Sequence, residues 1–436
     1  MKSGESVKQV RLVVLDPGHF HAALVQAGMY EQVSPDVYVY GPAGSDIEDY
    51  KANIQRFNQR PQNPTSWRLH VYTGDDFLTK AFAEKHGDVV VLAGNNSKKV
   101  DYITAAVESG HHVLADKPMC INPAEFQKLQ QAFETARKKG LLIFDIMTER
   151  FEITSLLQKA LVNNLSLAGP LQNGSLENPS IIKKSVHHFL KQVAGKTVQR
   201  PGWYFDTNQQ GEGIIDVTTH LADMAMWMCL PGQAVNYRDI EIIKGHRRPT
   251  MIDLPSFEKV TGLNQWPDFL KAQLNENGIL PCYANGRIDY RLKGIHTQIE
   301  VLWQYQAAPG TGDTHYSLVR TEKTDIVIRQ GARQNFRPEL YIEPDENTDK
   351  QKFQQQLQLA IDSLKDKYHG ISLSQTEDAW QILIPDDLRI SHEAHFQQVT
   401  RTFLRHLAAG KLPDYEVTNM LTKYYTTTSG LKAALS

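Results

Sequence analysis

The chain has 436 residues, of which 41% are hydrophobic and 22% charged, a globular composition with length enough for two domains. Its 47 basic and 49 acidic residues give a formal net charge of -2 and form no block of like charge, which argues against partners such as nucleic acid or an anionic membrane. The three cysteines, Cys120, Cys229 and Cys282, are too widely spaced for a disulfide framework or a zinc site.

No apolar run approaches the roughly 20 residues that span a bilayer. The apolar stretch at Leu12 to Leu15 is too short for the core of a secretory signal. We therefore expect a cytoplasmic protein, or one whose leader has been removed from the sequence.

Residues 1–147 alternate short β-branched runs with helical segments, a pattern typical of a parallel sheet with crossover helices. Two helices, 98–109 and 123–139, are followed by Gly110 and Gly140 as C-terminal caps. The pattern predicts a doubly wound α/β domain whose ligand lies beyond the carboxyl ends of the strands. The predicted strands are 9–16, 36–41, 67–74, 88–94, 111–116 and 140–147.

Residues 148–436 have a different texture, which predicts an α+β domain built on a large open, mostly antiparallel sheet. Residues 246–282 show little periodicity, and we expect a long surface excursion there. The predicted helices are 153–163, 392–409 and 416–435, and the predicted strands are 180–188, 239–244, 286–293, 298–306, 315–321, 325–330 and 339–343.

The turn after the first strand carries a reduced form of the GxGxxG dinucleotide fingerprint. Only the middle glycine, Gly18, is present, with Asp16 in the place of the first glycine and His21 in that of the third. On these residues alone, a strand–helix turn that binds no phosphate is the favoured explanation. The acidic residue that binds the ribose of NAD is missing at the end of the second strand. Ser45 and Asp46, which follow after a short loop, do not show whether the cofactor is NAD or NADP.

Polar residues follow the fourth and fifth strands at the same predicted edge. They are Asn95 and Asn96 after the fourth strand, and Asp116 and Lys117 after the fifth. A lysine directly after a buried strand needs a partner or solvent for its charge, and a ligand pocket offers both. The alternative is a lysine that extends its charge to the surface.

Asp216, His220 and Asp223 stand at i, i+4 and i+7 and would share one face of a helix. An aspartate one turn from a histidine can orient the imidazole and raise its basicity, which suits removal of a hydroxyl proton. The alternative is an ordinary polar pair on a solvated helix. An apolar stripe would adjoin this face, made by Val217, Leu221, Met224 and Met228.

Other histidines and aromatic residues are weaker candidates. His392 and His395 lack the spacing of a zinc motif, and no metal is expected. His187 and His188 would point to opposite sides of a strand, so at most one suits a pocket. The aromatic run 203–205 could stack on a sugar, although such residues more often serve packing.

Taken together, these junctions resemble the glucose-fructose oxidoreductase, inositol dehydrogenase and MocA (Gfo/Idh/MocA) family. Its members carry an AxPN-like turn after the fourth strand, an EKP turn after the fifth, and a glycine-rich loop that leads to DxxxH. The corresponding residues here are Gly94-Asn95-Asn96, Asp116-Lys117-Pro118, and Gly211-Glu212-Gly213 followed by Asp216 and His220. The order and spacing match over about the first 230 residues.

The resemblance implies an N-terminal Rossmann domain that binds NAD or NADP, and a second domain, 148–436, that binds substrate and forms homo-oligomers through its sheet. It implies that Lys117, Asp216 and His220 are catalytic and that a small sugar or polyol is the substrate. The cofactor would lie along Asp16, Gly18, His19, Phe20, Asn95, Asn96, Asp116 and Lys117.

Three functions remain open at this point. The first is an NAD(P)-dependent oxidoreductase that acts on a secondary alcohol of a sugar, cyclitol or derivative. The second is an NAD-dependent glycosidase or lyase that oxidises its sugar transiently. The third is a non-catalytic cofactor-binding regulator, which the reduced fingerprint favours and the presence of Lys117 and His220 disfavours.

Overall fold

The computed structural model describes residues 9–193, 196–197, 199–346 and 348–436. The chain forms two compact units. The first comprises the chain up to Thr148 together with Asn208–Gln210 and His392–Val417, and the second comprises Glu149–Thr207, Gly211–Ser391 and Thr418–Ser436. Among the described helices, none is both long and apolar enough to cross a membrane.

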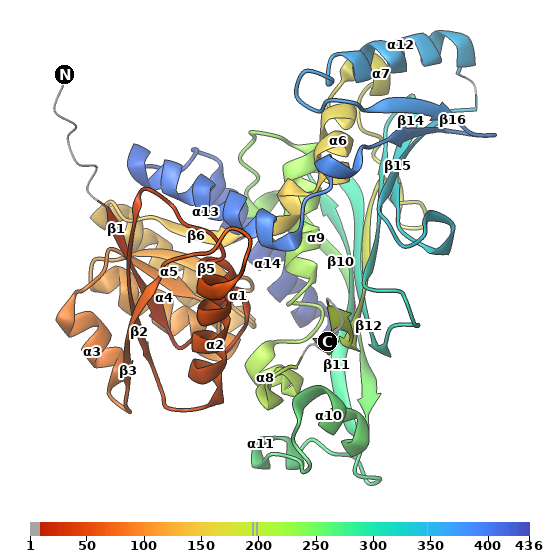
Figure 1. Cartoon of the computed structure of the whole chain (residues 1–436). Coiled ribbons are helices and arrows are strands. Elements are labelled where there is room, and N and C mark those ends of the chain that lie inside the picture. The colour runs from red at the N-terminus through yellow and green to blue at the C-terminus, as the bar shows by residue number, and fades with distance from the viewer. Residues whose placement is uncertain (1–8, 194–195, 198, 347) are drawn as a thin grey trace, which may run out of the picture. The chain divides into compact units, whose positions relative to one another are not determined.

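The first unit contains a six-stranded parallel sheet in the order β3-β2-β1-β4-β5-β6 (Figure 1). This is the strand order of a Rossmann fold, and the central β4 is buried at every position, as expected for a parallel sheet covered on both faces. All six predicted strands are confirmed. Their bounds are β1 Val10–Leu15, β2 Val33–Gly41, β3 Arg68–Thr73, β4 Val89–Leu92, β5 His112–Asp116 and β6 Ile143–Ile146.

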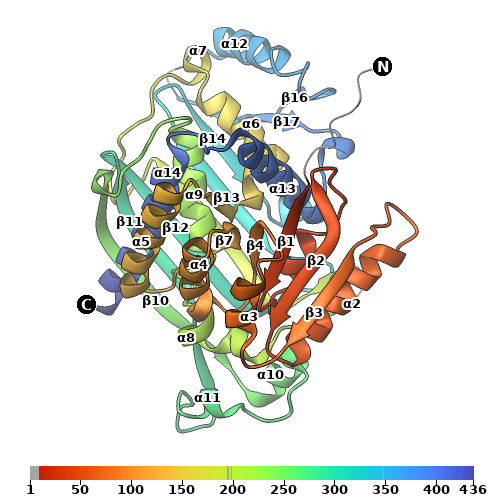
Figure 2. The same cartoon turned by 90° about the vertical axis from the view of Figure 1, so that its left-hand side faces the viewer.

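The crossover helices show why the sequence folds in this way. Helix α5 begins where the Asn122 side chain accepts a hydrogen bond from the Glu125 amide at 2.9 Å, and it ends at Gly140, whose φ of 67° suits a glycine. Helices α4 and α5 lie side by side (Figure 2). The helices of this unit are α1 His21–Leu24, α2 Ser45–Gln59, α3 Phe77–Glu84, α4 Lys99–Glu108, α5 Pro123–Lys139 and α13 His392–Ala409.

The second unit is built on a nine-stranded sheet in the order β10-β11-β12-β7-β13-β14-β15-β17-β16. Neighbouring strands are antiparallel except β12 and β7, which confirms the predicted mostly antiparallel sheet. The strands are β7 Ile181–Leu190, β10 Ile240–Ile252, β11 Leu280–Leu292, β12 Ile295–Gln306, β13 Thr314–Arg320, β14 Thr324–Arg329, β15 Glu339–Pro344, β16 Ser372–Gln375 and β17 Trp380–Leu383, with a separate hairpin of β8 Gln192–Val193 and β9 Lys196–Thr197.

Helices cover this sheet. Helix α9 packs on β7 and β12, and α6 packs on β14 and β15. Leu221, Met224 and Met228 of the predicted apolar stripe are buried, but Val217, its fourth member, precedes α9, and the helix is buried on nearly all sides rather than along one stripe. The helices outside the Rossmann sheet are α6 Ile153–Val162, α7 Leu165–Ala168, α8 Thr207–Gln210, α9 Thr218–Cys229, α10 Leu254–Thr261, α11 Asp268–Lys271, α12 Lys350–Asp362 and α14 Glu416–Leu435.

The prediction that residues 246–282 form a surface excursion is wrong. The segment completes β10, forms α10 and α11, and begins β11. Its apolar side chains lie in two short helices, in the loop between them and at two strand ends, so no long period reveals them in the sequence. Several of them belong to one buried cluster: Ile252, Phe257, Val260, Trp266, Leu270, Leu280 and Cys282.

Candidate active site

The turn that follows β1 is held against the end of β4 by backbone hydrogen bonds. The amides of Gly18 and His19 both donate to the carbonyl of Ala93, at 3.2 and 3.0 Å. Asp16 has a left-handed φ of 47°, and its carboxylate accepts a hydrogen bond from the Tyr102 hydroxyl at 2.8 Å. Asp16 therefore fixes the shape of this turn, whatever contact it makes with a ligand.

The Asp116 carboxylate, at the end of β5, is buried and surrounded by cationic side chains. Its Oδ2 lies 2.8 Å from His21 Nδ1 and 3.8 Å from His19 Nδ1. Lys99 Nζ donates to the backbone carbonyl of Asp116 at 2.9 Å. Burial raises the pKa of Asp116, but the cations, His21 foremost, together outweigh it and hold that pKa well below its ordinary value. Asp116 is thus ionised at neutral pH and anchors an imidazole that the sequence-based site did not include.

Asn95 and Asn96 are held in the first unit by side-chain bonds. Asn95 Nδ2 donates to the Gln209 side chain at 2.7 Å, and its Oδ1 accepts from the Ser97 amide at 3.1 Å. Asn96 is only 4% exposed, and its Nδ2 donates to the Gln210 carbonyl at 2.8 Å. Both asparagines therefore bind the segment Asn208–Gln210, which sequence reasoning did not place at this edge because it stands more than a hundred residues further along the chain. Their contact with a cofactor stays a prediction.

Lys117 directly follows β5, at the carboxyl edge of the sheet. Its amide donates to the Asp116 carboxylate at 3.0 Å, and a cis peptide bond joins it to Pro118. The carboxyl ends of β1, β4 and β5 thus bring together the residues predicted to line the cofactor.

The charge at this edge fits a dinucleotide. The lysines outnumber the two acids, Asp16 and Asp116, and two imidazoles add further positive charge when protonated. A pyrophosphate is attracted to such an excess of cations. At the end of β2, helix α2 begins after Gly44 with no side-chain cap. The cationic side chains at or next to these strand ends are His19, His21, Lys98, Lys99 and Lys117.

Within the described ranges, His19, His21 and Asp116 also form a group that could hold a metal ion, with ligand atoms within 4.8 Å of one another. The 2.8 Å contact between His21 and Asp116 explains the group without a metal. The absence of a metal from the site stays a prediction.

In the second unit, the glycine loop lies directly against β11. A Cβ atom on Gly213 would stand 1.6 Å from the Ala284 carbonyl oxygen, and one on Gly286 would stand 2.4 Å from Ile214 Cα. The Gly213 amide donates to the Tyr283 carbonyl at 3.0 Å. The glycines are therefore required for close backbone contact, which positions the residues that follow them.

The prediction that Asp216 shares one helix with His220 and Asp223 is wrong. Helix α9 begins at Thr218, and the buried Asp216 lies in the turns before it, where its amide donates to the Glu212 carbonyl at 3.0 Å. The backbone contacts of the glycine loop impose these turns. The pairing of Asp216 with His220 stays a prediction.

Asp223 is not presented to a substrate, contrary to the acid–imidazole–acid face that its spacing predicts. It is 1% exposed, and Arg150 and Lys423 both contact its carboxylate. Burial raises the pKa of Asp223, but the two cations outweigh it and hold that pKa below its ordinary value.

The weaker candidates also find places in the second unit. Tyr204 and Phe205 belong to the buried core, as the packing alternative proposes, and Trp203 packs at its margin. Although His187 and His188 are adjacent in a strand, both Nδ1 atoms reach the Asp313 carboxylate, each at 3.2 Å.

Two family models match the chain. Residues 47–144 match "Oxidoreductase family, NAD-binding Rossmann fold", and residues 157–435 match "Putative oxidoreductase C terminal domain". Together they span most of both units.

Known proteins agree with these matches. The crystal structure of a putative oxidoreductase from Parabacteroides merdae is 49% identical, covers 99% of this chain and 98% of its own, and superposes with a TM-score of 0.96. The D-glucoside 3-dehydrogenase of Escherichia coli is 23% identical over 234 residues, which are 52% of this chain and 56% of that enzyme. A 3-ketoreductase from Actinomadura kijaniata, solved with TDP-benzene and NADP, shares the fold at 13% identity and a TM-score of 0.56, with 98% of each chain covered.

The fold and these matches define a two-part nicotinamide-dependent oxidoreductase. The chain belongs to the Gfo/Idh/MocA family, and its first unit carries the NAD-binding Rossmann fold of that family.

Proposed function

We propose that this chain transfers a hydride between NAD or NADP and a secondary alcohol of a sugar, a cyclitol or a derivative of these. The observation that carries the proposal is the place of Lys117, directly after β5 at the carboxyl edge of a sheet with Rossmann strand order. Ligands of such sheets bind at this edge. The name of the D-glucoside 3-dehydrogenase supports a sugar-like substrate.

The proposed roles follow from the chemistry of alcohol oxidation. A bound nicotinamide supplies the hydride acceptor. As the carbon loses hydride, its hydroxyl must lose a proton, and the Lys117 ammonium would stabilise the developing alkoxide. His220 would accept the proton, since an imidazole titrates near neutral pH. Asp216 would orient His220 or hold a neighbouring hydroxyl.

From the family resemblance we also infer a homo-oligomer assembled through the nine-stranded sheet and a cytoplasmic location. A sedimentation velocity experiment tests the first inference. A monomer at micromolar concentration would contradict it.

Calorimetric titration of the purified protein with NAD, NADH, NADP and NADPH tests the function first. We expect at least one form to bind, and absence of heat with all four, on folded protein, would overturn the proposal. A steady-state assay with sugars and the bound cofactor follows. Net formation of NADH or NADPH supports the proposal, whereas turnover with catalytic cofactor and release of the sugar substituent would assign redox-assisted elimination instead.

A further inference from the structure

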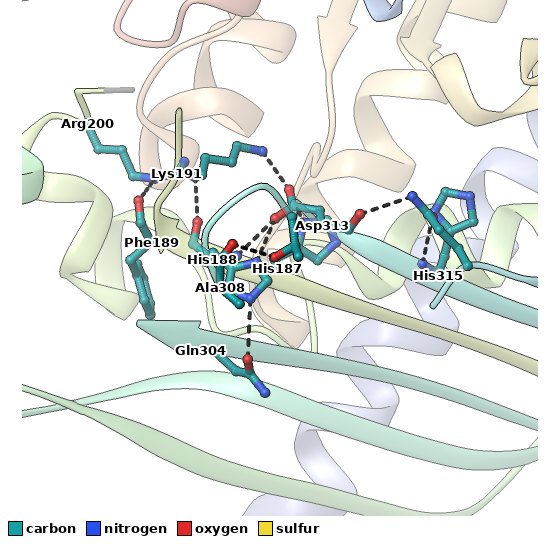
Figure 3. A network of polar contacts seen from close by, with 11 residues as sticks. His187, His188, Phe189, Lys191, Arg200, Gln304, Ala308, Asp313 and His315 are labelled. Carbon is teal, nitrogen blue, oxygen red and sulfur yellow. Dashed lines mark hydrogen bonds and ion pairs between the residues drawn. The ribbon is translucent and has the colours of Figure 1, made fainter. Parts of the chain in front are cut away.

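A buried arginine in the second unit lies beside a polar network at the ends of β7 and β12 (Figure 3). Arg200 is only 7% exposed. Its Nε donates to the Phe189 carbonyl at 3.2 Å, and its Nη2 donates to the His188 carbonyl at 3.3 Å. The backbone amide of Arg200 donates to the Val260 carbonyl at 3.0 Å, which fixes the residue to the end of α10.

Two aromatic rings complete the surroundings of this guanidinium. Its carbon lies 4.5 Å from the centroid of the Tyr204 ring and 5.2 Å from that of Trp303. No carboxylate of the described residues lies within ion-pair distance of Arg200. A buried cation without a counter-ion is costly, because carbonyl groups and rings replace only part of its hydration.

Two other arginines of the second unit also lie over an aromatic ring, and each of them pairs with a carboxylate. Arg247 lies 3.6 Å from the Tyr283 ring centroid and pairs with Glu212 at 2.7 Å. Arg329 lies 5.2 Å from the Tyr341 ring centroid and pairs with Glu343 at 2.5 Å. Both are more exposed than Arg200, yet each has a carboxylate. Arg200 therefore combines the deepest burial of the three with no acid of its own.

The acid of the network, Asp313, already has partners. The Asp313 carboxylate lies 2.5 Å from Lys191 Nζ and 3.2 Å from Nδ1 of both His187 and His188. Burial raises the pKa of Asp313, but the neighbouring cations, His187 first, outweigh it and hold that pKa well below its ordinary value. The single Asp313 carboxylate thus contacts one lysine and two imidazoles. Because Lys191 and Arg200 are both cationic, the cluster as a whole carries more positive than negative charge.

His187 of this cluster lies on the face of the sheet that α9 covers. His187 has the same strand parity as Lys183, whose Nζ contacts Met228 of α9. The His187 ring stacks on Trp303, its register partner in β12, with centroids 5.1 Å apart. Burial is the largest cause of the raised pKa of the Tyr204 hydroxyl. The charges of Asp216 and Asp313 raise this pKa further, and that of Arg200 lowers it. Arg200 thus lies against the ring of a tyrosine on the chain segment that leads to the proposed substrate-binding Asp216.

We propose that Arg200 binds an anionic group, a carboxylate or a phosphate, carried by the sugar-like substrate. Two of the five guanidinium N–H donors are used by backbone carbonyls, so three remain for a planar anion. Aromatic side chains around the guanidinium exclude water and strengthen the pairing. The proposal deepens the proposed function and rests on it: the substrate would be an acidic sugar rather than a neutral one.

The test is equilibrium binding of sugars to the protein saturated with the nicotinamide that binds it. The probes are D-glucuronate, D-glucose 6-phosphate and D-glucose, at equal ionic strength. We expect one charged sugar to bind roughly 10- to 100-fold more tightly than glucose, the range of a charge-assisted hydrogen-bonded pair. The two charged arms distinguish a carboxylate from a phosphate. Added salt should weaken the binding of the charged sugar and leave the binding of glucose unchanged.

Arg200→Met should abolish the preference for the charged sugar, and Arg200→Lys should retain part of it. Arg329→Met is the matched control, because it removes a stacked arginine that has its own acid, and it should leave the preference unchanged. Charged sugars that bind no better than glucose overturn the proposal, as does a preference that is undiminished in Arg200→Met. If Arg200→Met does not fold, Arg200→Lys and the salt series of the native protein decide. A protein that binds no nicotinamide would instead contradict the proposed function, and the two failures are distinct.

Discussion

The Asp223 carboxylate accepts a hydrogen bond from Lys423 Nζ at 2.8 Å, although 200 residues separate the two in the sequence. Their side chains are 1% and 0% exposed. Arg150 contacts both carboxylate oxygens, through Nε and Nη2, each at 2.7 Å. This triad, whose Asp223 and Lys423 are fully buried, joins α9 to α14 and to the chain that enters the second unit.

Asp223→Ala should strongly destabilise the protein, because it leaves a fully buried lysine and a mostly buried arginine without this acid. We expect a loss of about 3–5 kcal/mol in the free energy of unfolding, measured by urea denaturation at pH 7. Asp268→Ala is the control, since that side chain is 95% exposed and pairs with Lys271 on the surface, and it should cost less than about 1 kcal/mol. Equal effects of the two substitutions would show that the triad does not stabilise the fold.

The contribution of Asp223 should also depend on pH. Its pKa is lower in the folded chain than the ordinary 3.8, so its stabilisation is present above that value and is lost as the pH falls through the folded-state pKa. The difference in unfolding free energy between the native protein and Asp223→Ala should stay constant between about pH 5 and 8 and narrow below about pH 4. A difference that widens on acidification would contradict this sign.

Lys183 is a buried cation of another kind. It is 3% exposed, and its Nζ contacts the Ser317 hydroxyl at 2.6 Å, the side-chain oxygen Oε1 of Gln158 at 3.3 Å and the Met228 sulfur at 3.0 Å. Burial lowers the pKa of Lys183 from 10.5 to about 8. Its protonated form is therefore destabilised by folding.

Lys183→Met should raise the free energy of unfolding at pH 7 by about 1–2 kcal/mol, because it removes a buried charge while Ser317 and Gln158 still bond each other at 2.6 Å. The folded chain binds fewer protons than the unfolded one between pH 8 and 10.5, so native stability rises with pH there and the advantage of the variant should shrink. Lys184→Met removes a half-exposed neighbour on the other face and is the control. A destabilised Lys183→Met variant would show that the polar contacts of the lysine outweigh its burial.

The Rossmann sheet was predictable because most of its strands contain a short apolar run, as β1, β4, β5 and β6 do, and because α5 has clear caps at both ends. In α5, for example, Asn122 begins the helix and Gly140 ends it, and both signals stand in the sequence. Strand ends then fix where a ligand binds, so Lys117 and Asp116 could be assigned to the edge from sequence. In the sequence His21 stands only in the place of a glycine, since nothing local shows that it meets Asp116, 95 residues further on.

The second unit was harder to predict. Strand β10 lies at the edge of the sheet, and exposed polar residues interrupt its apolar pattern. Helix α10 buries only Phe257, Val260 and Thr261, which are too few positions to show a helical period in the sequence. Helix α12 and strands β16 and β17 were not predicted either. The place of Asp216 before α9 depends on contact between Gly213 and Ala284, a tertiary constraint that residue spacing cannot express.

Gly213→Ala tests that constraint. A methyl group there would overlap the Ala284 carbonyl oxygen, so the loop must move and carry Asp216 with it. We expect a loss of about 1–3 kcal/mol in unfolding free energy, with a fall in kcat/KM once a substrate is known. Gly312→Ala is the matched control, because a Cβ there meets nothing within 4 Å, and its effect should stay within about 1 kcal/mol. Normal stability and kcat/KM in Gly213→Ala would show that the loop has room to adjust.

The last prediction concerns Lys117 and His220, which we propose act on one proton transfer. Lys117→Met removes the cation that would stabilise the alkoxide, and His220→Ala removes the proton acceptor. Each should lower the rate of the chemical step roughly 100-fold or more, measured by single-turnover kinetics, with cofactor affinity less affected by His220→Ala.

The double variant decides whether the two residues work together. If alkoxide stabilisation and proton removal serve the same transition state, the loss of either already forfeits most of the benefit of the other. The double variant should then be far less impaired than the product of the single effects. Effects that multiply independently would mean that Lys117 and His220 contribute to separate steps. A single variant with near-native turnover would remove its residue from the chemistry and leave it a structural or substrate-binding role.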